Sequence, residues 1–208
     1  MPFYVLKMGG SLMPYSRELV RSLLALGEAG FSFLVVPGGG PMADLVRQIY
    51  SSGQLSQEGA HWMAILAMEE YAYFLADGTG APLTSKISRH QGHSSLEILL
   101  PYQALLKDDW GLKHSWDYTS DAVAALIAAQ LSSPLIKVTD VDGVLMDGIV
   151  VPELPAARLL GRESCIDQGT VQLLCGPLQG MRVLVFNGTD RDRFIIALRE
   201  GRAGTIIT

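Results

Sequence analysis

The chain has 208 residues, of which 49% are hydrophobic and 18% are charged, and it carries a formal net charge of −5. This length and apolar content suit a globular α/β protein, and we expect a single domain over residues 1–208. The acidic balance and the scattered lysines and arginines exclude a broad nucleic-acid-binding surface, although a small anionic ligand can still find a locally positive site.

Cysteine usage and hydropathy indicate a compartment. Cys165 and Cys175 are too few and too isolated for a disulfide framework or a zinc site. Lys7 and the pair Gly9-Gly10 interrupt what would be the apolar core of a signal peptide, and no window reaches the ~18 apolar residues of a membrane span. We therefore expect a soluble, cytoplasmic protein whose partners include neither nucleic acid nor a membrane.

Apolar runs alternate with helical periodicity along the chain, which favours a mostly parallel sheet covered on both faces. The segments 78–95 and 145–164 carry no period and are expected to be irregular. Strands are predicted at 3–8, 31–36, 96–100, 135–138, 182–186 and 205–207, and helices at 15–29, 41–51, 57–77, 101–107, 122–131, 168–175 and 190–200.

The first predicted strand runs directly into a glycine turn. Lys7 stands near its end, and Gly9, Gly10 and Ser11 follow. Glycines let backbone N–H groups approach an anion closely, and a following helix start adds its positive dipole end. A lysine in an apolar strand needs a partner, and a phosphate is a suitable one. This turn is therefore a candidate phosphate site.

A second glycine cluster follows the second predicted strand. Gly38, Gly39 and Gly40 precede Pro41, which suits the first turn of a helix. Three successive glycines exceed what a tight connection requires, and they expose backbone donors to a substrate. Two such turns indicate phosphoryl transfer, although neither a GxxxxGK[ST] loop nor a GxGxxG fingerprint occurs.

Further along the chain, the long helix predicted at 57–77 suggests an interface, and we expect a homo-oligomer. The histidines His61, His90, His93 and His114 show no metal-ligand spacing, so no protein metal site is expected. His114 lies beside Trp116 and before the segment around Asp121, where it could bind an anionic acceptor or donate a proton.

Several polar residues have two readings. Asp121 is a capping carboxylate or a catalytic one, since it stands at the head of a buried helix. Asp140 and Asp142 are turn residues, or they line a pocket at the carboxyl end of a strand. Lys137 either reaches a ligand or extends from the sheet edge, and we do not assign it to the site.

Four motifs in this order resemble the amino acid kinase family: KMGGS at 7–11, VPGGG at 36–40, TSDAVAA at 119–125 and VTDVDGV at 138–144. The resemblance implies an open, three-layer αβα sandwich with a mostly parallel sheet of about eight strands. It also implies ATP as phosphoryl donor and Mg²⁺ as cofactor. The chain is further similar to the small kinases of methanogens and methylotrophs, a group that includes the enzyme converting [5-(aminomethyl)furan-3-yl]methyl phosphate to the diphosphate.

The same resemblance implies roles for individual residues. Lys7 would contact the transferred phosphoryl group, and Asp121 would orient Lys7. Gly9, Gly10 and Ser11 would hold the nucleotide phosphates, with Gly38, Gly39 and Gly40 on the acceptor side. The loop that holds the nucleoside would comprise Thr139, Asp140, Asp142, Gly143 and Val144.

One departure from the family bears on the chemistry. Many relatives place a second catalytic lysine after a glycine-rich segment in the C-terminal half, whereas residues 165–180 contain none. Lys137, His114, Arg191 or Mg²⁺ would then have to neutralise the phosphoryl charge. Two alternatives stay open: a kinase for another acceptor, such as UMP, isopentenyl phosphate or a carboxylate, or a catalytically silent protein that binds a nucleotide or an oxyanion.

Overall fold

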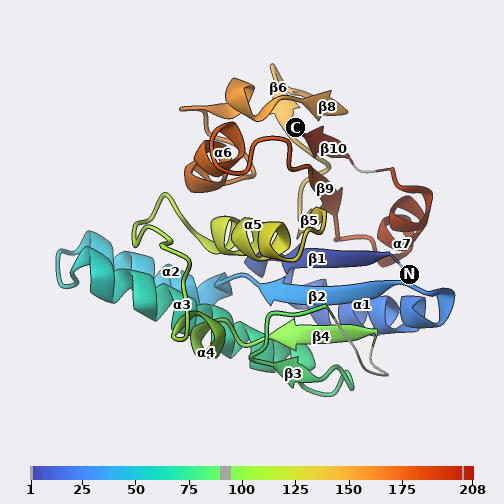
Figure 1. The fold of residues 1–208 in the computed structure, drawn as a ribbon, viewed down its shortest axis with the longest axis horizontal. Helices are drawn as coiled ribbons and strands as arrows, with labels where there is room; N and C mark the ends of the chain where they lie inside the picture. Colours follow the sequence, from blue (N-terminus) through green and yellow to red (C-terminus); the bar gives the residue numbers. More distant parts are fainter. Residues whose placement is uncertain (1, 90–94, 203) are drawn as a thin grey trace.

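The computed structural model describes residues 2–89, 95–202 and 204–208 (Figure 1). Its strands are β1 (Phe3–Met8), β2 (Ser32–Pro37), β3 (Leu83–Thr84), β4 (Leu96–Leu99), β5 (Leu135–Thr139), β6 (Leu145–Met146), β7 (Ile149–Val150), β8 (Glu153–Leu154), β9 (Val183–Asn187) and β10 (Thr205–Ile207). Its α-helices are α1 (Met13–Leu26), α2 (Gly40–Ser51), α3 (Gln57–Ala76), α4 (Pro101–Leu105), α5 (Ser120–Gln130), α6 (Gln168–Cys175) and α7 (Arg191–Glu200). Short 3₁₀ turns lie at η1 (Gly10–Leu12), η2 (Gly27–Ala29) and η3 (Ala156–Leu159).

Eight of these strands form one sheet in the order β3-β4-β2-β1-β5-β9-β10-β8. The neighbouring strands are parallel except β10, which runs antiparallel to β9. The predicted mostly parallel, eight-stranded sheet is therefore confirmed. Because β1 pairs with both β2 and β5, residues at its carboxyl end stand where the two halves of the chain meet.

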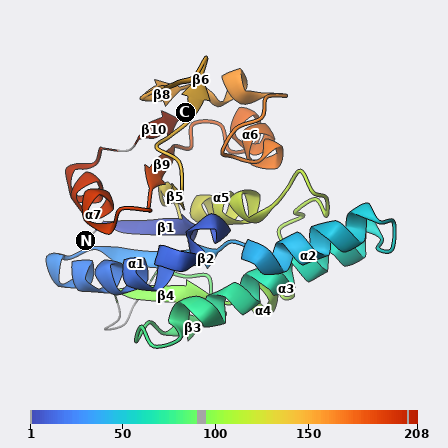
Figure 2. The ribbon, with the colours of Figure 1, turned by 180° about the vertical axis from the view of Figure 1, so that it is seen from behind.

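Alternation along the central strands divides the core into two clusters. Val5 and Leu34 face one side, where α5 and α6 supply the buried partners. Leu6 and Val35 face the other side, where α1 and α7 cover the sheet. Figure 2 shows α1 lying across the sheet when the molecule is seen from behind. The three-layer αβα arrangement is thus confirmed, and both faces of the sheet are buried under helices.

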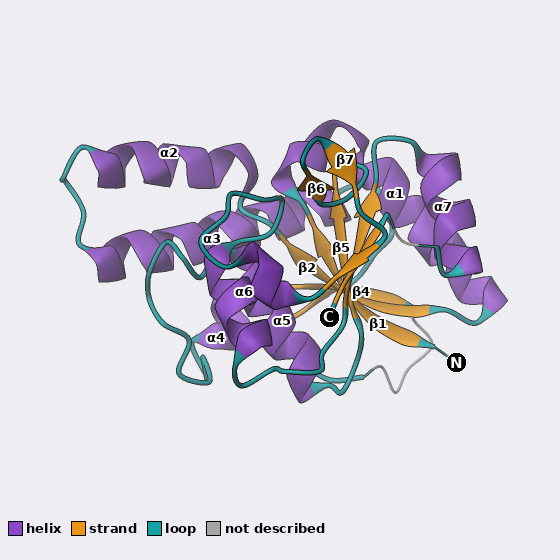
Figure 3. Ribbon diagram, turned by 90° about the horizontal axis from the view of Figure 1, so that it is seen from above, coloured by secondary structure: helices purple, strands orange, loops and turns teal. Residues whose placement is uncertain are grey.

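Helices α2 and α3 form a hairpin that projects beyond the carboxyl ends of the strands (Figure 3). The hairpin begins at Gly40, the last residue of the second glycine cluster. Helix α3 begins where the Ser56 hydroxyl accepts a hydrogen bond from Gly59 N at 3.0 Å. Helix α3 contributes Ile65 and Met68 to one core cluster and Tyr71, nearer its C-terminal end, to the other. The hairpin therefore forms a wall beside the glycine turns.

The segment 145–164 differs from the irregular loop expected there. It contains the β6–β7 hairpin, the edge strand β8 and the turn η3. Strands of two residues are too short to show an alternating pattern, and β8 forms by pairing with β10, which is distant in the sequence. The hairpin turn is formed by Asp147 and Gly148, both with positive φ.

The segment 78–95 likewise contains a short strand, β3, at the sheet edge. Its residues 90–94, with His90 and His93, lie outside the described part of the chain. Within the described part, no helix combines the length and the apolar character needed to cross a membrane.

Candidate active site

Two lysines from neighbouring strands share one buried carboxylate. Lys7 of β1 and Lys137 of β5 are directly paired in the parallel ladder, so both side chains leave the same face of the sheet. Asp121, in the first turn of α5, lies over them. Its Oδ1 is 3.0 Å from Lys7 Nζ, and its Oδ2 accepts a hydrogen bond from Lys137 Nζ. Two ammonium groups against one carboxylate leave this triad with a net charge of +1.

The triad is almost fully removed from water, with exposed fractions of 8% for Lys7, 4% for Lys137 and 4% for Asp121. Burial lowers the pKa of Lys7, the Asp121 carboxylate opposes that shift, and the nearby Lys137 ammonium adds to it. Burial would raise the pKa of Asp121, but the ammonium groups of Lys137 and Lys7 outweigh burial and hold this pKa far below its usual value. The carboxylate therefore stays ionised and orients both lysines.

A second aspartate braces the start of α5. Asp167 caps α6 through Thr170 N at 2.6 Å, and its other carboxylate oxygen accepts hydrogen bonds from Thr119 N at 3.1 Å and Thr119 Oγ1 at 2.6 Å. The backbone N of Asp167 donates to Asp121 Oδ2 at 3.3 Å. Burial and the neighbouring Asp121 raise the pKa of Asp167. This residue fixes the two helices that flank the triad.

The two glycine turns touch each other above the triad. A Cβ atom on Gly10 would lie 2.3 Å from Gly40 Cα, so only glycine permits this approach. Gly9 N and Gly38 N donate to Val138 O and Met8 O at 2.9 and 2.8 Å. Gly9 and Gly38 therefore hold the turns against the strands, whereas Gly10 and Gly40 are where the two turns meet.

A cavity of about 960 Å³ opens beside these turns. Its volume lies within the range of small-molecule sites. Helix α5 begins at this cavity, and a helix start favours an anion. The predicted residues that line the cavity are Lys7, Gly10, Ser11, Gly39 and Gly40, and Thr119 and Ser120 join them at the start of α5.

The segment expected to hold the nucleoside, residues 139–144, begins at the end of β5 and does not line this cavity. Thr139 ends the strand, and its Oγ1 donates to Asp140 Oδ1 at 3.2 Å. Asp142 Oδ1 accepts a hydrogen bond from Asn187 Nδ2 at 3.0 Å. Gly143 and Val144 pack against Thr205 of β10, and Val144 N donates to the Thr205 hydroxyl at 2.8 Å. Asp140 and Asp142 are exposed beyond the carboxyl end of β5, while Gly143 and Val144 support the loop.

His61 lines the cavity, whereas His114 does not. The two imidazoles are stacked with their centroids 4.0 Å apart. His114 joins Glu58 Oε2 at 2.6 Å and Asp109 Oδ2 at 2.9 Å through its two ring nitrogens. His114, which was expected to touch the acceptor, therefore packs against His61, and it is His61 that lines the cavity.

Of the three cationic side chains considered for the missing second lysine, Lys137 is the one that the fold brings to Lys7 and Asp121. Arg191 is bound at the surface to Glu18 Oε1 at 2.7 Å and to Asp192, and His114 is held by its carboxylates. No group of three or more His, Cys, Asp or Glu side chains suited to a metal ion occurs in the described part of the chain.

The two touching glycine turns, the start of α5 and the lysine pair held by Asp121 together suit the binding of phosphate groups at the carboxyl ends of the strands. Residues 2–167 match the model of the amino acid kinase family. The chain therefore belongs to the amino acid kinase family, whose members are ATP-dependent kinases, and it is a phosphotransferase.

Individual relatives agree with this assignment. The chain is 32% identical over 150 residues to [5-(aminomethyl)furan-3-yl]methyl phosphate kinase of Methanocaldococcus jannaschii, a match that covers 68% of this chain and 67% of that protein. Uridylate kinase from Archaeoglobus fulgidus has the same fold, with a TM-score of 0.69 and 20% identity over 99% of both chains. UMP kinase from Bacillus anthracis superimposes with a TM-score of 0.68 and 13% identity, over 100% of this chain and 97% of that one.

Three residues of the site were not assigned from the sequence. Lys137 gave a signal, a lysine inside an apolar strand, but its partner is 16 positions away and became evident only in the fold. Asp167 directly precedes a predicted helix, which marks it as a cap and no more. His61 carried no signal at all, because its orientation depends on how α3 packs.

Proposed function

We propose that this chain transfers the γ-phosphoryl group of ATP to a phosphate monoester and so produces a diphosphate. The proposed acceptor is [5-(aminomethyl)furan-3-yl]methyl phosphate, in the biosynthesis of a methanofuran-type cofactor. The observation that carries the proposal is the contact between the two glycine turns above the buried pair of lysines. The likeness to the Methanocaldococcus jannaschii enzyme supports the choice of acceptor.

The proposed step is a direct in-line displacement. An oxygen of the acceptor phosphate forms a bond to the γ-phosphorus while the bond from that phosphorus to the β-phosphate oxygen breaks, and ADP leaves. A phosphate monoester is already an anion near neutral pH, since its second pKa is about 6. The site therefore needs cations and positioning rather than a base, which suits a site whose charged core is two lysines and one carboxylate.

We assign the roles as follows. Lys7 contacts the transferred group, because it lines the cavity, and Asp121 orients Lys7. Lys137 acts through Asp121, since it keeps the triad at a net charge of +1, and so stands in for the second lysine of relatives. Gly10 and Ser11 hold the nucleotide phosphates, Gly39 and Gly40 hold the acceptor phosphate, and Gly9 and Gly38 keep both turns in place.

The nucleoside is proposed to bind at the loop that runs from Thr139 to Val144. Asp140 and Asp142 offer exposed carboxylates for polar groups of the nucleoside, and Gly143 and Val144 anchor the loop on β10. This arrangement puts the nucleotide beside the C-terminal half of the sheet and the acceptor beside the α2–α3 hairpin. The two substrates then meet at Gly10 and Gly40.

Mg²⁺ is proposed to arrive with the nucleotide. The described residues offer no preformed cage of protein ligands, and Mg²⁺ usually keeps several waters and binds through substrate phosphates in such sites. When bound, the ion would neutralise phosphate charge. The protein's own contribution to that charge is the lysine pair.

A coupled ADP-release assay with ATP and Mg²⁺ tests the proposal. The acceptors are [5-(aminomethyl)furan-3-yl]methyl phosphate, UMP, isopentenyl phosphate and aspartate. We expect ADP release with the furan phosphate, and Lys7→Ala should abolish turnover while the circular dichroism spectrum is retained. Release with a carboxylate alone would refute the phosphate-acceptor class, and nucleotide binding without turnover on any acceptor would establish a silent protein.

Two further properties are proposed. Self-association is supported by Leu66 and Tyr73 of α3, whose apolar side chains are 41% and 54% exposed. Sedimentation velocity at several concentrations tests it, and a monomer at every concentration would contradict it.

A reducing compartment such as the cytoplasm is supported by Cys165 and Cys175, both of which are free thiols.

A further inference from the structure

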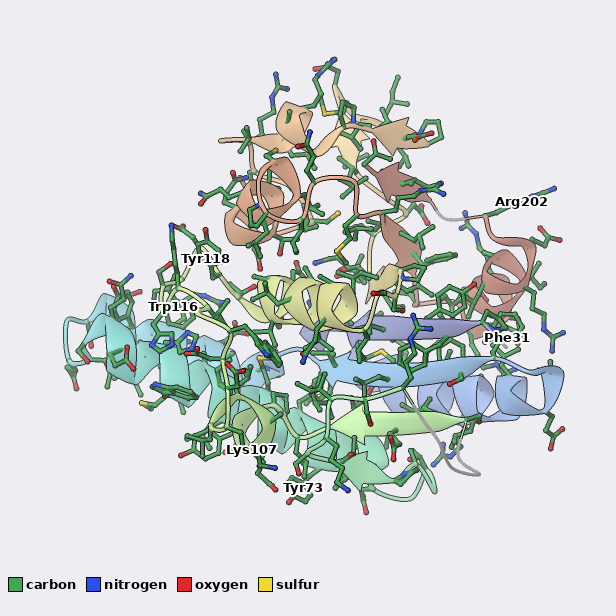
Figure 4. The ribbon with its side chains drawn as sticks, in the orientation of Figure 1. Phe31, Tyr73, Lys107, Trp116, Tyr118 and Arg202 are labelled. Atoms are coloured by element: carbon green, nitrogen blue, oxygen red, sulfur yellow. The ribbon has the colours of Figure 1, made fainter. Side chains whose placement is uncertain are left out.

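The loop between α4 and α5, residues 106–119, forms one wall of the cavity beside the glycine turns. Ser115, Trp116 and Tyr118 of this loop line the cavity. Figure 4 shows Trp116 and Tyr118 on this loop, beside the α2–α3 hairpin. The Trp116 ring packs against Tyr50 of α2, with the ring centroids 5.5 Å apart. Because the loop is built of turns and bends, side-chain contacts decide where its residues stand.

Both flanks of this loop are anchored. Leu112 is buried in the core cluster to which α5 and α6 contribute. The Tyr118 hydroxyl donates a hydrogen bond to Gln172 Oε1 of α6 at 3.0 Å. Between these two anchors, His114 reaches from the loop to α3. The position of residues 113–116 therefore depends on what His114 contacts.

His114 is held through both of its ring nitrogens. Its Nδ1 is 2.6 Å from Glu58 Oε2 of α3, and its Nε2 is 2.9 Å from Asp109 Oδ2 of the same loop. An ionised carboxylate only accepts hydrogen bonds, so both nitrogens have to donate, and only the imidazolium form does so. The geometry therefore indicates a charged ring. In agreement, although burial opposes it, the two carboxylates raise the pKa of His114.

The surroundings of this ring hold it in place. Glu58 lies in the first turn of α3, where the helix dipole favours a carboxylate, and its Oε1 accepts a hydrogen bond from Trp62 Nε1 at 2.7 Å. The face of the His114 ring stacks on His61, with the centroids 4.0 Å apart. Burial and the neighbouring His114 lower the pKa of His61 to about 4, so His61 is neutral near pH 7. The imidazolium of His114 therefore lies against two carboxylates and a neutral ring.

Loss of the proton from His114 breaks this arrangement. A neutral imidazole keeps one N–H group, so its other nitrogen would present a lone pair to a carboxylate. Losing the contact to Glu58 detaches the loop from α3, and losing the contact to Asp109 removes the brace within the loop. Ser115 and Trp116 follow His114 directly in the chain, so either loss frees the residues that form the wall.

We propose that His114 is a positioning residue for the acceptor: its imidazolium bridges Glu58 and Asp109 and thereby holds Ser115 and Trp116 in place as one wall of the acceptor cavity. Deprotonation of His114 then weakens binding of the acceptor. The loop proposed to hold the nucleoside, residues 139–144, does not line this cavity, so binding of ATP changes little. The inference rests on the proposed phosphate-acceptor function, since that proposal assigns the cavity to the acceptor.

The test measures KM for [5-(aminomethyl)furan-3-yl]methyl phosphate from pH 6.5 to pH 9.5, with saturating ATP and Mg²⁺. At each pH the KM of a variant is divided by that of the wild-type chain, which cancels the titration of the substrate itself. We expect His114→Gln to raise KM by about tenfold at pH 6.5, the size of one hydrogen bond to a charged group. This ratio should fall towards one as the pH rises through the pKa of His114 in the wild-type chain. The values of kcat and of KM for ATP should stay close to those of the wild-type chain.

Three further variants separate a charge effect from a structural one. His114→Arg keeps a cation at every pH, and its planar fork suits two carboxylates, so its KM should stay low up to pH 9.5. Glu58→Gln removes one of the charges that hold the proton, so the rise in KM should occur at a lower pH than in the wild-type chain. Lys107→Gln, exposed in the same loop, should leave KM and its pH dependence unchanged.

Amide hydrogen exchange gives a readout that does not depend on turnover. Leu112, Ser115 and Tyr118 donate backbone hydrogen bonds within the loop. At pH 6.5 we expect these amides to exchange faster in His114→Gln than in the wild-type chain, while those of α7 exchange at the same rate in both.

The outcomes separate the inference from the function on which it rests. A KM ratio for His114→Gln that is one at pH 6.5, or that is raised by the same factor at every pH, would overturn the inference and leave the phosphate-acceptor function standing. A fall in kcat with unchanged KM, or equal exchange of the loop amides in both chains, would overturn it as well. Turnover of no phosphate monoester by the wild-type chain would overturn the proposed function and the inference with it.

Discussion

At the scale of single residues, the active site depends on how three charges are shared. Asp121 binds Lys7 and Lys137 at once, and it keeps both ammonium groups in a space that excludes water. A carboxylate between two lysines lowers their mutual repulsion without cancelling their combined charge. Asp121 therefore positions both lysines. Lys137 on β5 contributes charge to the site although it is not part of either glycine turn.

Replacing Lys137 with methionine tests this sharing of charge. The substitution removes one unit of positive charge and keeps most of the side-chain volume. We expect kcat to fall by about 10²- to 10³-fold, the range seen when a preorganised electrostatic contact is lost, with a much smaller change in KM. Steady-state kinetics measures the split, with Lys107→Met in the exposed turn after α4 as the matched control. Wild-type kcat in Lys137→Met would remove Lys137 from the site.

His114 gives a second prediction at this scale, on stability and pH. Its pKa is raised above the ordinary value of 6.5 in the folded chain. A raised folded-state pKa contributes stability that is fully present below pH 6.5 and is lost as the pH rises through the folded value. The melting temperature of the wild-type chain should therefore exceed that of His114→Gln most clearly at pH 5.5 to 6.5, and the difference should shrink towards pH 8.5. A difference that grows with pH would contradict a raised pKa for His114 in the folded chain.

At the scale of elements, the site depends on two turns that approach each other more closely than side chains allow. The first follows β1 and the second precedes α2, and Gly10 and Gly40 meet backbone to backbone. Each turn is anchored to the end of a strand, through Gly9 N and Gly38 N. In the proposed arrangement of substrates, the spacing between the nucleotide and acceptor phosphates is thus set by packing of the main chain.

Gly10→Ala tests that spacing. Its methyl group would lie 2.3 Å from Gly40 Cα and 2.5 Å from Gly40 N, so one of the turns must move. We expect a loss of stability on the order of 1–3 kcal/mol, as for overpacked sites, together with a loss of turnover. Gly148→Asn in the β6–β7 hairpin is the control, because asparagine tolerates positive φ and nothing lies within 4 Å of its Cβ position. Urea unfolding and the ADP-release assay measure the two effects, and unchanged turnover in Gly10→Ala would contradict the account of the turns.

At the scale of the whole molecule, one sheet runs through both halves of the chain. β1 stands between β2 and β5, so the segments proposed to bind the acceptor and the nucleotide share one core. We propose that residues 1–208 form a single domain for this reason. Substrates bound on either side of β1 would then be held in a fixed relation by the sheet itself.

A single domain predicts one cooperative unfolding transition. Far-ultraviolet circular dichroism reports on the whole fold, whereas Trp62, Trp110 and Trp116 all lie near α3, α4 and the loop before α5. Circular dichroism and tryptophan fluorescence should nevertheless report the same midpoint in urea. A saturating nucleotide should shift that midpoint upward for both probes, since a ligand that binds the folded state stabilises it. Two separated transitions would contradict the single-domain proposal.

Much of the fold could be predicted from the sequence because glycine and proline mark its element ends. Pro41 and the glycines before it predicted the start of α2 to within one residue, and Gly30 correctly ended the first helical segment. The edge strand β8 could not be predicted, since two residues carry no pattern and only pairing with β10 makes them a strand.

The site could be predicted less completely, because its geometry comes from contacts between distant parts of the chain. The glycine turns, Lys7 and Asp121 are each followed or preceded by a recognisable element, which made them visible. The pairing of Lys7 with Lys137 depends on the register of β1 and β5. Which of His61 and His114 faces the cavity depends on how the loop before α5 packs against α3, and no local pattern records that.

The central claim is that the chain forms a phosphate–phosphate bond on a phosphate monoester. Phosphorus NMR of a reaction containing the wild-type chain, Mg²⁺, ATP and [5-(aminomethyl)furan-3-yl]methyl phosphate tests it most directly. The account predicts the appearance of ADP together with two new, mutually coupled resonances of an organic diphosphate, and their absence with Lys7→Ala. Unchanged ATP and acceptor, or ATP consumed to ADP and inorganic phosphate with no coupled pair beyond that of ADP, would contradict it.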